Sequence, residues 1–182
     1  MKKLLFLLLA SCLPVLATAQ TVISAGAGEK PVWATIADPE FTLRYPPDWA
    51  LDQTGLFGSS FFLYAPLEAR NDTFRENFNL IINDLSEFPG ISLAEVAEGA
   101  RQQIVGMIND ATILEFKEMP DGFDKYYQIE YTGTQGKFKL HWRQHYWLAH
   151  NHFYVLTFTA EETDYKRYLP LVEEVFGSFF LK

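Results

Sequence analysis

The chain has 182 residues with a formal net charge of −8, and aromatic residues make up 16% of it. The surplus of negative charge disfavours unspecific binding to nucleic acid, so we expect no nucleic-acid partner. The single cysteine, Cys12, excludes an internal disulfide and any metal site built from several thiolates.

Residues 1–19 have the pattern of a secretory signal peptide. Lys2 and Lys3 precede an apolar segment at residues 4–17, and the small residues Ala17, Thr18 and Ala19 follow. The apolar segment is too short to span a membrane. We therefore predict an exported protein, periplasmic or secreted, that is cleaved after Ala19 and has no transmembrane segment in its mature part.

A membrane-anchored lipoprotein is the alternative for this segment. Residues 9–12 have the order of a lipobox, in which Cys12 would be acylated. The apolar run continues to Ala17, however, as if the core of the signal had not ended at Cys12. We favour cleavage after Ala19 over the lipid anchor.

Residues 20–32 are small and rich in glycine, without periodicity, and we expect a flexible leader there. One domain is predicted over 33–182.

Its first strand, at residues 41–45, alternates apolar and polar side chains and ends at Pro46 and Pro47. Trp49 is expected to close the end of the sheet. Two further strands are predicted at 60–65 and 77–85.

The periodicity then changes to that of a helix. Ser92 and Glu95 have the spacing of a capping box, and apolar residues recur at helical spacing as far as Ile108, which predicts a helix over 92–109. A short strand follows at 112–117. Strands at 125–132, 137–148 and 152–160 are expected to form an antiparallel meander. The final helix, predicted over 165–179, contains Pro170, which should bend it or remove a hydrogen bond.

This order of elements predicts an α+β fold with one antiparallel sheet. Bulky apolar residues occupy both alternating sets of positions in the last strands, so we expect both faces of the sheet to be covered. The predicted architecture is an α/β/α sandwich.

Five segments of the chain resemble the PsbP-like family, which includes the extrinsic photosystem subunit and bacterial DcrB-like periplasmic proteins. They are Phe-Thr-Leu-Arg-Tyr-Pro-Pro-Asp-Trp at 41–49, Glu-Asn-Phe-Asn-Leu-Ile-Ile at 76–82, Tyr-Tyr-Gln-Ile-Glu-Tyr at 126–131, His-Phe-Tyr-Val-Leu-Thr-Phe at 152–158 and Phe-Gly-Ser-Phe at 176–179. All are strand ends and core aromatics, and none is a catalytic motif. The resemblance implies a non-enzymatic binding or assembly factor.

A basic stripe is the first candidate site, because alternate residues of one strand share a face. The residues that form it are Lys137, Lys139, His141, Arg143 and His145. On an acidic protein such a stripe could bind an anionic group of a partner. Alternatively, these side chains pair with cross-strand carboxylates such as that of Glu130.

Histidines are the second candidate. His141 and His145 would lie about 13 Å apart on a strand and could not share a metal ion. His150 and His152 flank a predicted turn and could approach each other, but a zinc site needs three or four ligands. We therefore predict no metal and no cofactor.

A hydrolase is a third hypothesis, since carboxylates that meet only in the fold leave no motif in the sequence. The segment Gly58-Ser59-Ser60 lacks the second glycine of a nucleophile elbow, and no His-Glu-x-x-His motif is present. We predict a non-catalytic domain that binds another envelope protein or assists assembly. The alternative is a carrier of a small molecule or lipid, with Trp49, Trp142 and Trp147 lining a pocket.

Overall fold

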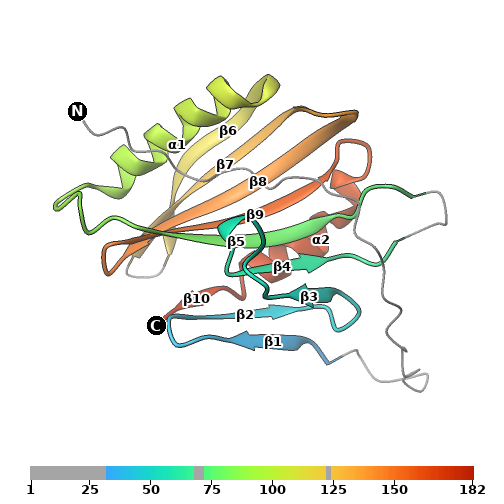
Figure 1. Ribbon diagram of the computed structural model, residues 1–182, viewed down its shortest axis with the longest axis horizontal. Helices are drawn as coiled ribbons and strands as arrows, with labels where there is room; N and C mark the ends of the chain where they lie inside the picture. Colours follow the sequence, from blue (N-terminus) through green and yellow to red (C-terminus); the bar gives the residue numbers. More distant parts are fainter. Residues whose placement is uncertain (1–31, 68–71, 122–123) are drawn as a thin grey trace.

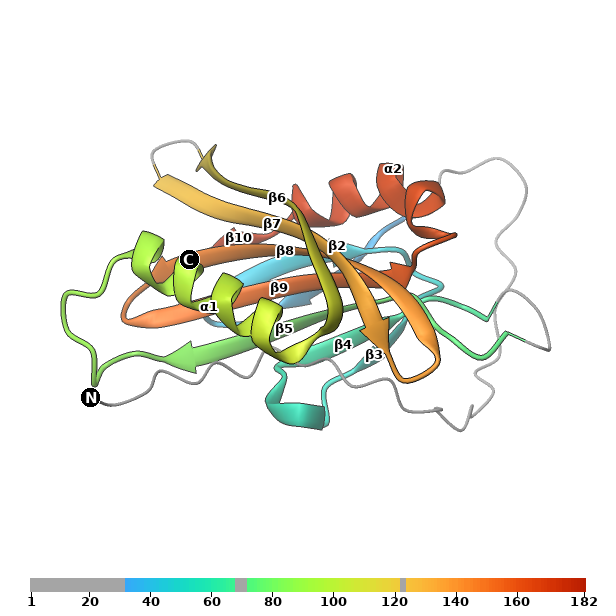
Figure 2. The same cartoon turned by 90° about the horizontal axis from the view of Figure 1, so that it is seen from above.

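The elements stack in three layers in the computed structural model, which describes residues 32–67, 72–121 and 124–182 (Figure 1). A seven-stranded sheet forms the middle layer. Helix α1 (Leu93–Met107) covers one face, and helix α2 (Tyr165–Phe176) covers the other together with a three-stranded sheet. Seen from above, the two helices lie on opposite sides of the large sheet (Figure 2). This confirms the predicted α+β fold with both sheet faces covered.

The predicted signal peptide, with Cys12, lies outside the described residues, as does all of the predicted leader except Val32.

Every neighbouring pair of strands in the seven-stranded sheet is antiparallel. The predicted meander is confirmed, and the strand predicted at 112–117 extends it as a much longer edge strand, because it pairs with β7 along nearly its whole length. The spatial order of the strands is β3 (Ala50–Asp52), β4 (Phe61–Tyr64), β5 (Asn77–Asp84), β9 (His152–Glu161), β8 (Phe138–Ala149), β7 (Asp124–Gln135) and β6 (Asn109–Asp121). A short 3-10 helix, η1 (Leu56–Gly58), connects β3 to β4.

The remaining strands form a separate sheet, which corrects the expectation of a single one. Strand β2 (Phe41–Tyr45) lies between β1 (Ala34–Ala37) and β10 (Phe180–Leu181). The two prolines that follow β2 have no N–H to donate, and the chain turns there, with the Trp49 N–H donating to the Pro46 carbonyl at 3.1 Å. Strand β3 therefore begins in the other sheet.

The capping box at the start of α1 is confirmed. The Glu95 N–H donates to Ser92 Oγ at 3.3 Å, and the Ser92 N–H donates to Glu95 Oε2 at 2.9 Å. The helix ends at Met107, two residues before the predicted end, because Ile108 already has an extended backbone. The face that α1 turns to the sheet consists of Leu93, Val96, Ala97, Ala100 and Ile104.

Helix α2 is shorter than predicted and ends at Phe176. Beyond it, the Gly177 N–H donates to the Glu173 carbonyl at 2.9 Å, and the chain continues into β10. Pro170 lies inside the helix on its exposed side, where the carbonyl that loses a donor can bind water instead.

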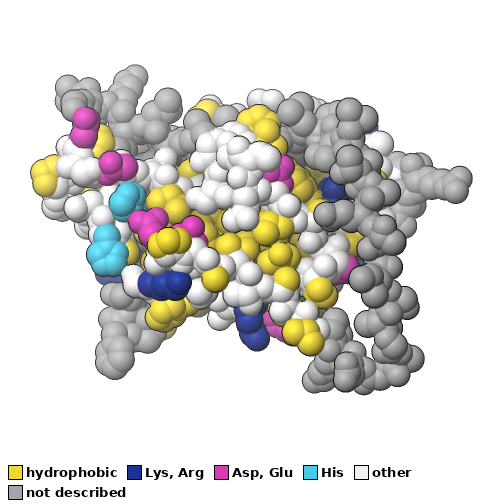
Figure 3. Space-filling model, turned by 60° about the horizontal axis from the view of Figure 1, so that its bottom comes forward, with side chains coloured by type: hydrophobic (Ala, Val, Ile, Leu, Met, Phe, Trp, Pro, Cys, Tyr) yellow, Lys and Arg dark blue, Asp and Glu magenta, His cyan; other side chains and the backbone are white. Residues whose placement is uncertain are grey.

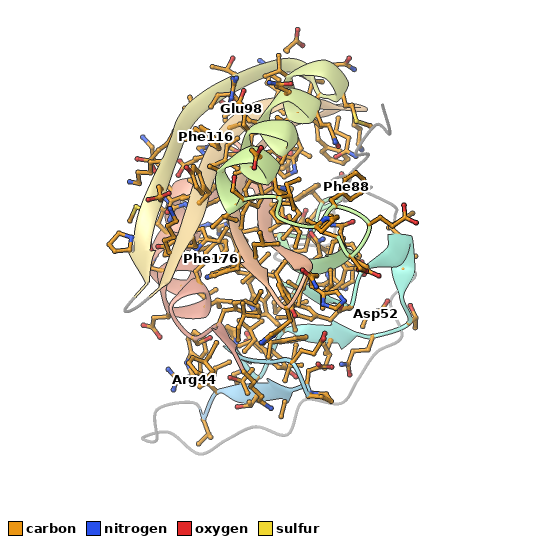
Figure 4. All side chains as sticks on the ribbon, turned by 90° about the vertical axis from the view of Figure 1, so that its left-hand side faces the viewer. Arg44, Asp52, Phe88, Glu98, Phe116 and Phe176 are labelled. Atoms are coloured by element: carbon orange, nitrogen blue, oxygen red, sulfur yellow. The ribbon has the colours of Figure 1, made fainter. Side chains whose placement is uncertain are left out.

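Aromatic side chains fill the space on both sides of the large sheet. On the α2 side, Phe78 packs against Trp49 and against Phe176, with ring centres 6.0 Å and 5.1 Å apart. Figure 4 shows Phe176 among the side chains between α2 and the sheet. On the α1 side, Trp142 stacks on Tyr131 at 5.0 Å. Burial of such large rings accounts for a stable core in a domain with no disulfide among its described residues.

Two glycines near the end of α1 should respond to alanine with opposite signs. A Cβ on Gly133 would lie 2.5 Å from Ile108 Cγ2 and 2.9 Å from the Asn109 carbonyl oxygen, whereas Gly106 has open space around it. We expect Gly133→Ala to lower the free energy of unfolding by about 1–3 kcal/mol through overpacking. Gly106→Ala should raise it by about 0.5–1 kcal/mol. Chemical denaturation measures both, and changes of the same sign would contradict the packing of β7 against this turn.

Candidate functional site

Three of the five residues in the predicted basic stripe lie beneath α2. His141, Arg143 and His145 are only 9%, 8% and 4% exposed. The His141 ring stacks on Tyr165 with 3.4 Å between ring centres, and the His145 ring stacks on Phe176 at 3.9 Å. These residues share one face of β8, as predicted, but a helix covers that face.

Lys137 and Lys139, at the start of the stripe, are exposed. Lys137 Nζ lies 4.9 Å from the centre of the Phe138 ring and donates to Thr73 Oγ1 at 3.2 Å. The accessible part of the stripe is therefore a pair of lysines at one end of β8. Figure 3, which turns the underside of the molecule forward, shows dark blue Lys and Arg side chains scattered over that face.

The carboxylate of Glu130, on β7, compensates the buried cationic side chains of β8. Its Oε1 lies 2.8 Å from His141 Nε2, and its Oε2 accepts from Arg143 Nε at 3.0 Å and from Arg143 Nη2 at 2.9 Å. The remaining end of the Arg143 guanidinium donates to Glu173 on α2. This confirms the alternative prediction, in which a cross-strand carboxylate pairs with the stripe.

The electrostatics of this network keep Glu130 ionised. Burial by itself would raise the pKa of Glu130, but the hydrogen bond from His141 and the positive charge of Arg143 outweigh it and lower the pKa to about 2. The buried ion pair joins Arg143 to Glu130 within the sheet, whereas Glu173 on α2 is 64% exposed and adds only a weak ionic contact. The stacking of Tyr165 on His141 and of Phe176 on His145 holds α2 on this face. The role of the buried stripe residues in the described structure is attachment.

His145 is neutral in its surroundings. Its ring lies between Tyr126 at 4.6 Å and Phe176. Gln128 donates its amide N–H to Glu115, so the Gln128 oxygen accepts, and His145 Nε2, 3.1 Å away, carries the proton. Burial, together with the nearby charges of Arg143 and Lys117, lowers the pKa of His145 to about 3.

A second polar row, on the α1 side of the sheet, was not among the predicted sites. Asn77 and Asn79 on β5 lie directly opposite Thr159 and Thr157 on β9. All four are buried, and among the described residues Asn77 Oδ1, Asn79 Oδ1 and Thr159 Oγ1 have no hydrogen-bond partner. Thr157 Oγ1 accepts from Gln144 at 3.1 Å. Polar residues at alternate positions of an otherwise apolar strand are the signal that could have indicated this row.

The three tryptophans proposed to line a pocket do not lie together, which corrects that part of the carrier hypothesis. Trp49 and Trp147 belong to the core on the α2 side, whereas Trp142 belongs to the core on the α1 side. All three are buried against other aromatic rings. Their separation follows from the strand alternation, which turns Trp142 and Trp147 to opposite faces of β8.

His150 and His152 lie at the turn from β8 to β9, where His150 is exposed and His152 is opposite Asp84. Within residues 32–67, 72–121 and 124–182, no three His, Cys, Asp or Glu side chains are grouped closely enough to hold a metal ion. Neither of the described helices has the length and apolar character needed to cross a bilayer.

No protein-family model matches this chain, and no curated protein matches it by sequence. Solved structures do share its fold. Cyanobacterial PsbP from Synechocystis, at 17% identity, has a TM-score of 0.62, with 87% of this chain and 98% of that one covered. LpqN of Mycobacterium tuberculosis, described as involved in cell envelope biogenesis, has a TM-score of 0.58 at 11% identity, with 83% and 91% covered.

The yeast Ran-binding protein Mog1p, from Saccharomyces cerevisiae, is also similar, with a TM-score of 0.54 at 8% identity and with 84% and 96% covered. At such identities the likeness concerns the fold alone. The chain therefore has a PsbP-like fold, which the resemblance of its strand ends and core aromatics also indicated.

Acid should destabilise the protein through His145 before it protonates Glu130. The unfolded chain protonates His145 near its ordinary pKa of 6.5, whereas the folded chain does so only at about 3. The stabilisation is complete above pH 6.5 and is lost as the pH falls, by about 1.4 kcal/mol per unit. We expect His145→Gln to flatten this dependence between pH 6 and pH 4.5, measured by urea unfolding.

The matched control is His150→Asn, at an exposed position whose positive φ of 49° asparagine tolerates. This variant should keep the slope of the parent protein. An unchanged slope in His145→Gln would contradict the neutral, buried state of His145.

Proposed function

We propose that this protein is an exported, non-catalytic binding domain that contacts another protein of the cell envelope. The observation that carries the proposal is the state of the charges on β8. His141 and Arg143 are held by Glu130 beneath α2, which leaves Lys137 and Lys139 as the part of the stripe that a partner could reach. The buried charges serve attachment of a helix, so the stripe offers a contact surface and no reactive centre.

The cellular location of the protein is part of the proposal. The pattern of residues 1–19 supports export, with cleavage after Ala19. The fold is compatible with export, since it is shared by a protein described as involved in cell envelope biogenesis. It is compatible with a contact role, since it is also shared by a protein described as Ran-binding. These roles belong to those proteins, and they support a contact role for this one.

The lysine pair indicates the chemistry of the partner surface. The chain carries a net charge of −8, so an acidic partner would be repelled by most of its surface and attracted at this end of β8. Exposed ion pairs contribute about 0–1 kcal/mol each. The lysines would therefore orient a partner that presents carboxylates and would supply only part of the affinity.

Two exposed lysines allow a test with matched charge changes. Lys139→Glu alters the stripe, whereas Lys166→Glu makes the same change on the exposed side of α2. We expect affinity capture from envelope extracts to recover one defined protein with the parent chain and with Lys166→Glu, and about tenfold less of it with Lys139→Glu. Equal recovery by all three chains, or no reproducible protein, would count against the proposal.

A carrier of a small polar molecule is the second candidate, because the oxygens of Asn77, Asn79 and Thr159 lack donors among the described residues. Native mass spectrometry of the protein purified from envelopes would then show an added mass that Asn79→Leu loses. If the protein carries no ligand, the spectrum shows only the mass of the chain, which contradicts the carrier hypothesis. Asn79→Leu should then raise the free energy of unfolding by about 1–2 kcal/mol, since it removes an unpaired buried polar group.

A further inference from the structure

Strand β6 leaves one side of the large sheet without a neighbouring strand. It is 13 residues long and ends the strand order, whereas the opposite edge strand, β3, has only three residues. A long open edge is a template for pairing with another chain unless its sequence prevents this. Register shifts occur between Asn109 and Thr112 and between Ile113 and Glu115, so the regular part of this edge is 115–121.

Pro120 indicates which backbone groups of β6 face outward. Proline cannot donate to a strand ladder, so its nitrogen belongs on the side away from β7. Residues of the same parity in a strand direct their N–H and C=O groups the same way. The N–H and C=O groups of Phe116 and Glu118 are therefore directed away from β7, toward the open edge.

Charged side chains on this edge restrict what can pair with it. Glu115 and Lys117 lie on one face of β6, where Lys117 Nζ is 2.6 Å from Glu115 Oε1. If two copies of β6 pair antiparallel about an axis at residue 115, Glu115 faces its own copy. If the axis lies at residue 117, Lys117 faces Lys117 of the second copy. Like charges directly opposite each other destabilise strand pairing.

A two-fold axis at Phe116 instead places opposite charges opposite each other. Glu115 then lies opposite Lys117 of the second copy, and the symmetry repeats the pair. Phe116 lies opposite itself, in the register where its outward N–H and C=O groups can exchange two hydrogen bonds. Of the three axes compared, only the one at Phe116 places opposite charges opposite each other, and the parity set by Pro120 supplies the outward hydrogen-bonding groups that this axis needs. The pairing is centred on residues 115–117, which lie inside the regular part of the edge.

Apolar side chains next to this position support the same contact. On the α1 side, the Arg101 guanidinium lies 5.8 Å from the centre of the Phe116 ring, and Figure 4 shows Phe116 on β6 beside α1. Leu114 on β6 and Val105, one helical turn beyond Arg101, are each 53% exposed. With the axis at Phe116, the Phe116 ring of a second copy would add apolar surface at this position, whereas Leu114 would lie opposite Glu118 of that copy. Cross-strand aromatic pairs also stabilise antiparallel sheets.

We propose that β6 pairs with β6 of a second copy of this chain, antiparallel and with the two-fold axis at Phe116, so that the two seven-stranded sheets join into one. The occupant of the edge is a second copy because the register that pairs opposite charges is self-complementary. The contact does not involve Lys137 or Lys139, so it is independent of the function proposed above.

Disulfide trapping tests the register. In a Cys12→Ser background, which has no other thiol, Phe116→Cys would place two thiols on residues whose Cα atoms are about 5.5 Å apart, within the range of a disulfide. The matched control is Glu118→Cys, whose copies would be separated by about 13 Å along the strands. We expect mild oxidation to give a covalent dimer of the first variant and to leave the second monomeric. No dimer, or equal trapping of both, would overturn the proposal.

Sedimentation velocity over a range of protein concentrations tests the charges. The parent chain should show a monomer–dimer equilibrium, and Lys117→Glu should raise its dissociation constant at least about tenfold, because two attractive pairs become repulsive. The double variant Glu115→Lys with Lys117→Glu restores opposite charges and should restore the dimer. Circular dichroism checks that each variant is folded. If Lys117→Glu does not fold, the dimerisation of the double variant tests the proposal. A parent chain that stays monomeric at all concentrations, or a double variant that does not dimerise, would overturn the proposal.

Discussion

A buried guanidinium connects the layers of this domain. Arg143 lies on β8 and binds the carboxylates of Glu130 on β7 and Glu173 on α2. Glu130 compensates the buried charge, and the bond to Glu173, whose side chain is 64% exposed, adds a weak ionic contact between the sheet and α2. With α2 in this position, Tyr165 stacks on His141 and Phe176 on His145, so the ionic and aromatic contacts agree on one placement of the helix.

The two faces of the large sheet satisfy their polar groups differently. On the α2 side the charged side chains of β7 and β8 bind one another, and His145 is kept neutral between two rings. On the α1 side, Asn77, Asn79 and Thr159 keep oxygens without donors among the described residues. Buried polar groups are normally paired, so the fold alone does not explain the chemistry of this second row.

Two outer surfaces carry the contacts proposed for this domain. The small sheet and α2 together close one side of the core, and β10 pairs with β2, so the last strand of the chain fastens the first strands to the domain. The contact surfaces proposed above are the exposed start of β8 and the long edge formed by β6. Both are backed by the rigid sheet, which would hold contact residues in place.

Local features of this chain were determined by its sequence alone. The Ser92–Glu95 capping box, the alternating strands and the break at Pro46 and Pro47 all depend on interactions within a few residues. The resemblance of strand ends and core aromatics to PsbP-like proteins was likewise visible in the sequence.

The tertiary structure decided how these elements combine. Alternation showed that the stripe residues share a face, but only the position of α2 determined that His141, Arg143 and His145 are covered and Lys137 and Lys139 are not. The pairing of β10 with β2 and the ion pair of Arg143 with Glu173 join residues far apart in the chain. Such contacts form only when a helix or strand packs on an element that is distant in the sequence. Their stability comes from burial and strand pairing between elements, and no local sequence pattern determines these interactions.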